Sequence, residues 1–221
     1  MNEERYVWYA SYGSNLSIAR FLYRLEGGRP PGSANEEKGC RDETPPKDNK
    51  PICIHFPLYF AKYSQKWCGG VAFIGLDKDA ENTTYGRRYL ITQEQFTDVF
   101  KQENRRSNIP NDFEIDFEEV KKRVSRAFCK SWYGNVVYLN ESQGLPIFTF
   151  TAYWNIRATP FTAPSEKYLK HLISGLKETY PFTDENLVKY LIEKPGIKGN
   201  FTEDKLKHLC QKASCISFNS Q

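Results

Sequence analysis

The hydrophobic positions near the N-terminus change from one period to another, and this change is the most informative local pattern in the chain. Residues 6–12 are rich in aromatic and β-branched side chains and predict a strand. Residues 16–25 carry apolar side chains three or four positions apart and predict a helix. Gly13 permits a tight turn between the two, and Ser14 or Asn15 is a suitable N-cap. The backbone amides at such a helix start suit a carboxylate, a phosphate or an oxyanion; a turn without a ligand is the alternative.

The same patterns predict the other elements and the fold class. Strands are expected at 52–62 around Pro57, and at 69–74, 85–91, 133–139 and 145–151, the last two as a hairpin. Helices are expected after Thr92, at 113–124, after Ser165, at 185–193 and at 203–212. Residues 29–50 are polar and predict a loop. Because strands and helices are mixed rather than strictly alternating, we expect an α+β domain built on a small closed sheet.

The helix after Thr92 carries the main candidate for chemistry. Thr92 and Gln95 form a capping box. The apolar face of this helix consists of Phe96, Val99 and Phe100. Glu103 follows these residues at helical spacing and lies on the same stripe. Desolvation raises the pKa of a carboxyl group toward the range in which it exchanges a proton near neutral pH, so Glu103 is a candidate general acid/base.

A second interpretation of Glu103 needs no chemistry. The last turn of the helix can fray, and Glu103 then lies in water or pairs with Arg105 or Arg106. Periodicity alone does not separate this interpretation from the first.

Composition restricts the classes of protein to consider. The chain has 221 residues without a Gly/Ser-rich or Pro-rich linker, which predicts a single domain over 1–221. Its net charge of +4 is mild and its basic residues are interleaved with acids, so we expect no nucleic-acid partner. No apolar stretch has the length of a membrane helix, and residues 1–5 do not resemble a secretory signal, so we expect a cytoplasmic protein and no membrane partner.

The cysteines do not predict a metal centre. The six cysteines are dispersed without a CxxC pair and are expected to be free thiols. His208, Cys210 and Cys215 lie near one another in sequence but lack a second ligand pair at the usual spacing. We therefore expect neither a metal nor a cofactor.

Four separated stretches carry motifs that occur together in one known family. Residues 9–16 read Tyr-Ala-Ser-Tyr-Gly-Ser-Asn-Leu, and residues 67–72 contain Trp-Cys-Gly-Gly. Residues 89–104 form a predicted strand–helix unit that ends in Glu-Asn, and residues 163–168 contain Pro-Ser-Glu-Lys-Tyr. In order and outline spacing, over most of residues 6–176, these stretches resemble the γ-glutamylcyclotransferase family.

The resemblance implies a small mixed β-barrel with surrounding helices and a pocket at one barrel end. It implies that Glu103 is the general acid/base. The implied substrate-binding residues are Tyr12, Gly13, Ser14, Asn15, Leu16 and Tyr168. The reaction implied is release of 5-oxoproline and a free amine from a small γ-glutamyl amine or γ-glutamyl amino acid, without a cofactor.

The chain also departs from the family pattern. Asn104 replaces a glycine after the glutamate, and Asn tolerates the left-handed conformation that glycine would supply at a helix end. Ser11 replaces a small apolar residue in the loop. The segments near 29–50, 105–128 and 180–221 resemble additions to the family's core.

Two other functions are compatible with the sequence. The same pocket can bind a γ-glutamyl-like or carboxylate ligand without turnover, as a binding or sensor module. A binding protein, however, has little reason to bury an unpaired carboxylate such as Glu103. An RNA-associated protein is disfavoured because the positive charge is neither strong nor clustered.

Overall fold

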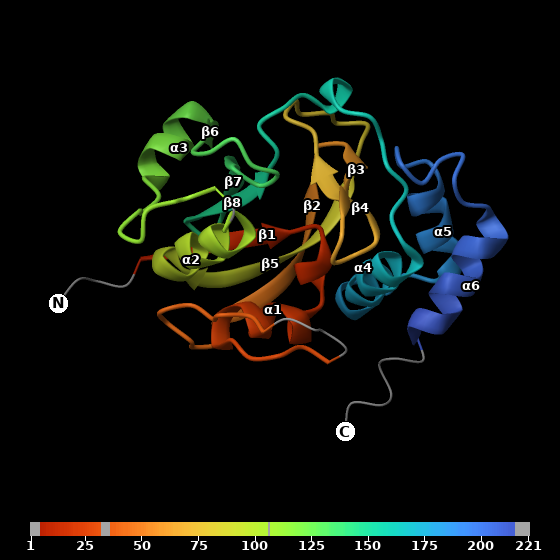
Figure 1. Cartoon of the computed structure of the whole chain (residues 1–221), viewed down its shortest axis with the longest axis horizontal. Helices are drawn as coiled ribbons and strands as arrows, with labels where there is room; N and C mark the ends of the chain where they lie inside the picture. The colour runs from red at the N-terminus through yellow and green to blue at the C-terminus, as the bar shows by residue number, and fades with distance from the viewer. Residues whose placement is uncertain (1–4, 32–35, 106, 215–221) are drawn as a thin grey trace. The chain divides into compact units, whose positions relative to one another are not determined.

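The computed structural model describes residues 5–31, 36–105 and 107–214. The predicted α+β class is confirmed, because the described part contains a mixed sheet together with several helices (Figure 1). Closure of the sheet into a barrel stays a prediction. The residues form two compact units. The first falls within 1–11, 18–52 and 87–153, and the second within 12–17, 53–86 and 154–221.

A mixed sheet lies mainly in the first unit. Its strands are β1 (Tyr6–Ser11), β2 (Asp48–Ile54), β5 (Thr84–Thr92), β6 (Ser125–Ala127), β7 (Asn135–Ser142) and β8 (Leu145–Thr151). Among the described residues they lie in the order β2-β5-β1-β8-β7-β6. β1 is antiparallel to β5, with Tyr9 opposite Tyr89, and parallel to β8, with Tyr9 opposite Phe148. The aromatic run of β1 therefore lies inside the sheet, where both of its edges are paired.

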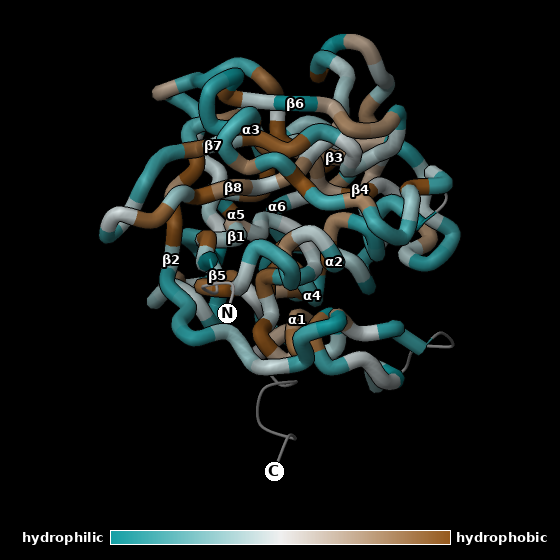
Figure 2. Tube along the Cα trace, turned by 90° about the vertical axis from the view of Figure 1, so that its left-hand side faces the viewer, coloured by the Kyte–Doolittle hydropathy of each residue, from teal (hydrophilic) through white to brown (hydrophobic). Residues whose placement is uncertain are grey.

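The described residues of the first unit also form the helices α1 (Ile18–Glu26), α2 (Gln93–Glu103) and α3 (Phe117–Arg123). The core between these helices and the sheet is largely aromatic. Tyr9 stacks on Phe150 at 5.1 Å between ring centroids, and Phe21 stacks on Tyr89 at 4.1 Å. Phe96 meets Tyr9 edge-on at 5.6 Å. Figure 2 shows apolar residues along β7 and β8, which supply further members of this core.

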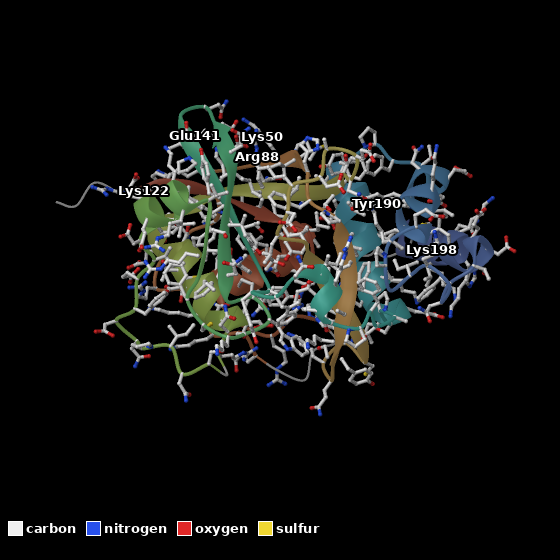
Figure 3. The ribbon with its side chains drawn as sticks, turned by 90° about the horizontal axis from the view of Figure 1, so that it is seen from above. Lys50, Arg88, Lys122, Glu141, Tyr190 and Lys198 are labelled. Atoms are coloured by element: carbon white, nitrogen blue, oxygen red, sulfur yellow. The ribbon has the colours of Figure 1, made fainter. Side chains whose placement is uncertain are left out.

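One face of the sheet carries basic side chains over a buried indole. The Lys50 ammonium lies 5.7 Å from the centroid of the Trp8 ring, and the Arg88 guanidinium lies 4.6 Å from it. Lys50 and Arg88 are labelled close together in Figure 3. Such cation–π contacts cover the ring while the charged groups remain near water.

In the described part of the second unit there are a small antiparallel sheet and several helices. Its strands are β3 (Leu58–Ser64) and β4 (Gly69–Ile74), with Leu58 opposite Ile74. Its helices are α4 (Glu166–Thr179), α5 (Asp184–Ile192) and α6 (Glu203–Ser214), together with the short 3-10 turns η1 (Ser14–Leu16) and η2 (Ile156–Ala158). α4, α5 and α6 pack together (Figure 1). Within the described ranges, no helix has the length and apolar character that a membrane span requires.

Several predicted boundaries are wrong for identifiable reasons. The first helix starts at Ile18, because Ser14–Leu16 forms a separate 3-10 turn and neither Ser14 nor Asn15 caps α1. The strand expected at 52–62 is two strands divided at Pro57, which cannot donate to a ladder. The helix expected at 113–124 begins at Phe117, where the side chain of Asp116 accepts the Glu119 amide. The loop expected at 29–50 includes the start of β2.

Candidate functional site

The loop after β1 forms one turn of 3-10 helix. The Leu16 amide donates to the Gly13 carbonyl at 3.0 Å, and Tyr12, Asn15 and Leu16 are buried. Within the part of the chain that the structure describes, the amides of Gly13 and Ser14 donate to no protein acceptor. Their N–H groups therefore have the hydrogen-bonding capacity that an anionic ligand group requires.

Gly13 lies directly against the hydroxyl of Tyr168. A β-carbon on Gly13 would come 3.3 Å from the Tyr168 hydroxyl oxygen and 3.9 Å from the Ala72 Cβ. The Tyr168 hydroxyl also accepts a hydrogen bond from the Ala72 amide at 3.1 Å. Three stretches that are far apart in sequence thus meet at the Tyr168 hydroxyl, and the absence of a side chain at Gly13 permits this approach.

The start of α4 fixes the position of Tyr168. Ser165 caps the helix by accepting the Tyr168 amide at 3.1 Å, and its hydroxyl donates to the Trp67 carbonyl. The Tyr168 ring meets the Trp67 ring edge-on at 5.1 Å between centroids and is only 2% exposed. Ring, hydroxyl and backbone are all held, so Tyr168 is a rigid part of its surroundings.

The glycine pair that opens β4 explains why these motifs occur together. A β-carbon on Gly70 would lie 2.1 Å from the Thr162 carbonyl oxygen, and one on Gly69 would lie 2.6 Å from the Ser165 amide nitrogen. The Gly70 amide donates to the Ala163 carbonyl at 2.8 Å. The backbone at the start of β4 is in direct contact with the backbone of residues 162–165. A side chain at either glycine would push the segment that opens α4 away from β4.

A glycine on α4 brings the helix close to the loop. A β-carbon on Gly175 would lie 2.5 Å from the Leu16 Cβ and 2.7 Å from the Ser17 amide nitrogen. Leu16 itself is fully buried. The loop over 12–16 and Tyr168 on α4 are therefore two parts of one packed assembly within the second unit.

Glu103 belongs to the first unit, where it closes α2. The apolar stripe before it is confirmed, because Phe96, Val99 and Phe100 are fully buried. Glu103 is neither unpaired nor fully buried: its side chain is 17% exposed, and its Oε1 lies 2.7 Å from Nη2 of Arg24 on α1. The expectation of an unpaired carboxylate is thus wrong, because α1 places a guanidinium against the end of α2.

Arg24 holds two carboxylates at once. Its Nη1 lies 2.8 Å from Oε2 of Glu37, whose side chain is 2% exposed. Burial alone lowers the pKa of Arg24, but the charges of Glu103 and Glu37 outweigh it, so the pKa of Arg24 is raised. The guanidinium therefore remains charged in its buried position and bridges the two glutamates.

The residues after Glu103 also differ from expectation. Asn104 has a φ of −111°, so it does not adopt the left-handed conformation. Its side chain instead donates to the Phe100 and Tyr133 carbonyls at 2.9 and 3.0 Å, which ends the helix by hydrogen bonding. Arg105 lies 3.7 Å from Glu37. Arg106, the other expected partner of Glu103, is outside the described residues, as is Cys215.

Sequence reasoning missed Arg24 and Glu37. Arg24 follows Phe21 by one helical turn and lies on the buried stripe of α1, so helical spacing marks it in the same way as Glu103. Glu37 lies in a polar segment without periodicity, and no local signal marks it.

Comparison with known proteins finds two kinds of similarity, and no protein-family model matches the chain. Histone deacetylase 5 from Arabidopsis thaliana is 33% identical over 199 residues, which cover 84% of this chain and 30% of that protein. The chain thus spans under a third of the length of this relative, and the activity in its name is that of the relative.

Solved structures similar to this chain include γ-glutamyl cyclotransferases. One such structure has 17% identity and a TM-score of 0.49 over 94% of this chain and 99% of the other. An uncharacterised protein from Homo sapiens has 19% identity and the same TM-score and coverage. A yeast γ-glutamyl cyclotransferase specific to glutathione has 14% identity and a TM-score of 0.31, over 96% of each chain. Chains this distant need not share a reaction.

Proposed function

We propose that this protein is a cyclotransferase that converts a γ-glutamyl amine or γ-glutamyl amino acid to 5-oxoproline and the free amine. The observation that carries the proposal is the close approach of Gly13 to the Tyr168 hydroxyl, which joins the loop to the late helix. Both belong to stretches whose motifs resemble the γ-glutamylcyclotransferase family. This contact gives the resemblance a physical basis in the chain's own packing.

The reaction assigns a role to each group. The substrate α-amine loses a proton to the Glu103 carboxylate and attacks its own γ-carbonyl carbon, which closes a five-membered lactam. The resulting oxyanion, or the substrate carboxylate, receives hydrogen bonds from backbone amides of the loop that includes Gly13 and Ser14. The C–N bond to the leaving amine then breaks, and that amine takes the proton back from Glu103.

Positioning supplies much of the rate in such a reaction, because nucleophile and electrophile belong to one molecule. A rigid Tyr168 and a tightly packed loop are suited to hold the substrate in its cyclising conformation. Arg24 fixes one oxygen of Glu103, so that the carboxyl group is presented in a defined orientation.

A panel of γ-glutamyl amino acids, γ-glutamyl amines and glutathione tests the proposal. We expect the wild-type protein to release 5-oxoproline from at least one of them, and the best substrate identifies the leaving group. No release from any member would contradict the proposal.

A binding or sensor module is the second candidate, and one observation favours it. The Arg24–Glu103 ion pair removes the objection that a binding protein would bury an unpaired carboxylate. In that case members of the same panel would raise the thermal unfolding midpoint without forming product.

A further inference from the structure

Between α1 and β2, the described residues 36–40 are hydrogen-bonded to the ends of two helices. Gly28 and Glu37 exchange backbone hydrogen bonds at 3.0 and 2.8 Å, and the Cys40 amide donates to the Leu25 carbonyl at 2.8 Å. The Gln102 amide group donates to the Arg24 carbonyl and to the Gly39 carbonyl, each at 2.8 Å. The described residues 36–40, which lie in the segment near 29–50 that resembles an addition, are therefore tied to the last turns of α1 and α2.

This attachment places Glu37 among positive charges. Its carboxylate lies 2.8 Å from Arg24, 3.7 Å from Arg105 and 3.9 Å from Arg20. A carboxylate as buried as Glu37 needs such partners, and a buried guanidinium needs a balancing charge in turn. Glu37 thus compensates the charge that Arg24 carries into the interior.

The geometry at Arg24 then determines the position of Glu103. Separate nitrogens of one planar guanidinium contact Glu37 and Glu103, at 2.8 and 2.7 Å. A planar fork held on one side by a fixed carboxylate presents its other nitrogen in a fixed direction. The carboxyl group of Glu103 is therefore oriented by a residue from a distant segment.

We propose that Glu37 and Arg24 are positioning residues for Glu103: Glu37 holds the Arg24 guanidinium, and Arg24 holds Oε1 of Glu103 while the proton moves. This inference rests on the proposed cyclotransferase function. It gives residues 36–40 a part in that reaction, because the orientation of Glu103 depends on Glu37.

The proposal predicts a specific change in pH dependence. Removal of the negative charge of Glu37 leaves the positive charge of Arg24 less balanced, which changes the electrostatic field at the reacting group. The acid limb of the kcat profile then moves to lower pH, by roughly half a unit or more. Glu37→Gln keeps the other ionisable side chains that the structure describes near Arg24 and Glu37. These include Arg20 on α1, Tyr9 on β1, Cys40 before β2 and Arg105 after α2.

The closing experiment compares Glu37→Gln with Glu36→Gln by kcat against pH on the best γ-glutamyl substrate. Glu36 is an exposed neighbour, so its variant makes the same chemical change without touching the ion pairs. Arg24→Lys is the second variant, because it keeps the buried charge if Glu37→Gln fails to fold, and Arg29→Lys is its exposed control. Lysine lacks the planar fork and cannot orient two carboxylates in the same way.

We expect Glu37→Gln and Arg24→Lys to lower kcat about tenfold or more, with the acid limb displaced in Glu37→Gln and both controls matching the wild type. A purely structural role would reduce the folded fraction and scale the profile without moving it. Profiles of Glu37→Gln and Arg24→Lys that coincide with their controls would overturn this inference and leave the cyclotransferase proposal standing. A wild type without 5-oxoproline release would overturn both.

Discussion

The hydroxyl of Tyr168 accepts the backbone amide of Ala72 at 3.1 Å, so a residue implied to line the substrate site also holds the backbone of β4. Gly13 lies against the same hydroxyl. One oxygen atom thus connects the loop, the strand and the late helix of the second unit. Changes at Tyr168 are expected to affect both stability and substrate binding.

Tyr168→Phe tests this double role. The substitution removes the hydroxyl that accepts the buried Ala72 amide and is expected to cost about 1–3 kcal/mol of unfolding free energy. It is also expected to raise KM several-fold, because Tyr168 lines the proposed site. Urea unfolding and steady-state kinetics measure the two effects.

Tyr190→Phe is the matched control for Tyr168→Phe. Tyr190, labelled in Figure 3, accepts the Tyr85 amide at 3.2 Å and lies on α5, outside the proposed site. Its variant should lose similar stability and keep the wild-type KM. Equal KM values for both variants and the wild type would remove Tyr168 from the site.

Gly175→Ala should lower the free energy of unfolding, although a Gly→Ala substitution inside a helix usually raises it. Alanine in place of a helix-interior glycine normally stabilises by about 1 kcal/mol. Here the new Cβ would lie 2.5 Å from the Leu16 Cβ, so we expect a loss of about 1–3 kcal/mol and a raised KM as the loop is displaced. Thermal unfolding and KM together check this; a stabilised variant with unchanged KM would show that α4 and the loop are not in close contact.

Gly70→Ala should be more damaging than Gly144→Ala. At Gly70 the new Cβ would lie 2.1 Å from a backbone oxygen, whereas at Gly144 nothing lies within 4 Å and the only cost is the positive φ of 75°. We expect about 1 kcal/mol for Gly144→Ala and several kcal/mol, or failure to fold, for Gly70→Ala. Soluble yield and chemical unfolding of the two variants give the comparison.

Alkaline pH should destabilise the second unit through Tyr59. Burial raises the pKa of Tyr59 from 10.0 to about 12. A group whose pKa is higher in the folded chain contributes stability that is complete below the unfolded value and is lost as pH rises toward the folded value. We therefore expect the thermal unfolding midpoint to decrease as the pH is raised from 10 to about 12.

Tyr59→Phe should reduce the decrease of the thermal unfolding midpoint at alkaline pH. Tyr63→Phe, at a position 62% exposed, should not reduce it. Burial also raises the pKa of Tyr190, so part of the decline should remain in Tyr59→Phe. Thermal unfolding between pH 9 and pH 12 measures the three profiles, and an unchanged decline in Tyr59→Phe would contradict the assignment.

Helices and strands whose ends are marked by capping residues or glycines could be predicted from sequence. The capping box of Thr92 and Gln95 is confirmed, and so is the Ser165 cap of α4. β4 begins at Gly69 and ends at Ile74, as expected. These signals act between residues a few positions apart, so they do not depend on the rest of the fold.

Interactions between distant segments were beyond the sequence patterns. Periodicity placed Glu103 on the buried stripe but carried no information about Arg24, which reaches it from another helix. Glu37 has no periodic context at all. Asn104 was expected to use its backbone freedom, whereas it ends α2 through side-chain hydrogen bonds to Phe100 and Tyr133. The candidate residues could be named from the sequence, but their partners could not.

The most direct measurement is 5-oxoproline release by the wild type, Glu103→Gln and Glu94→Gln on the best γ-glutamyl substrate. Glu94 is an exposed glutamate on the same helix, and Glu94→Gln makes the same chemical change away from Arg24. We predict release by the wild type and Glu94→Gln, and a rate about 10²–10⁴-fold lower in a folded Glu103→Gln. Release by Glu103→Gln at the wild-type rate would contradict the assignment of Glu103 as the general acid/base.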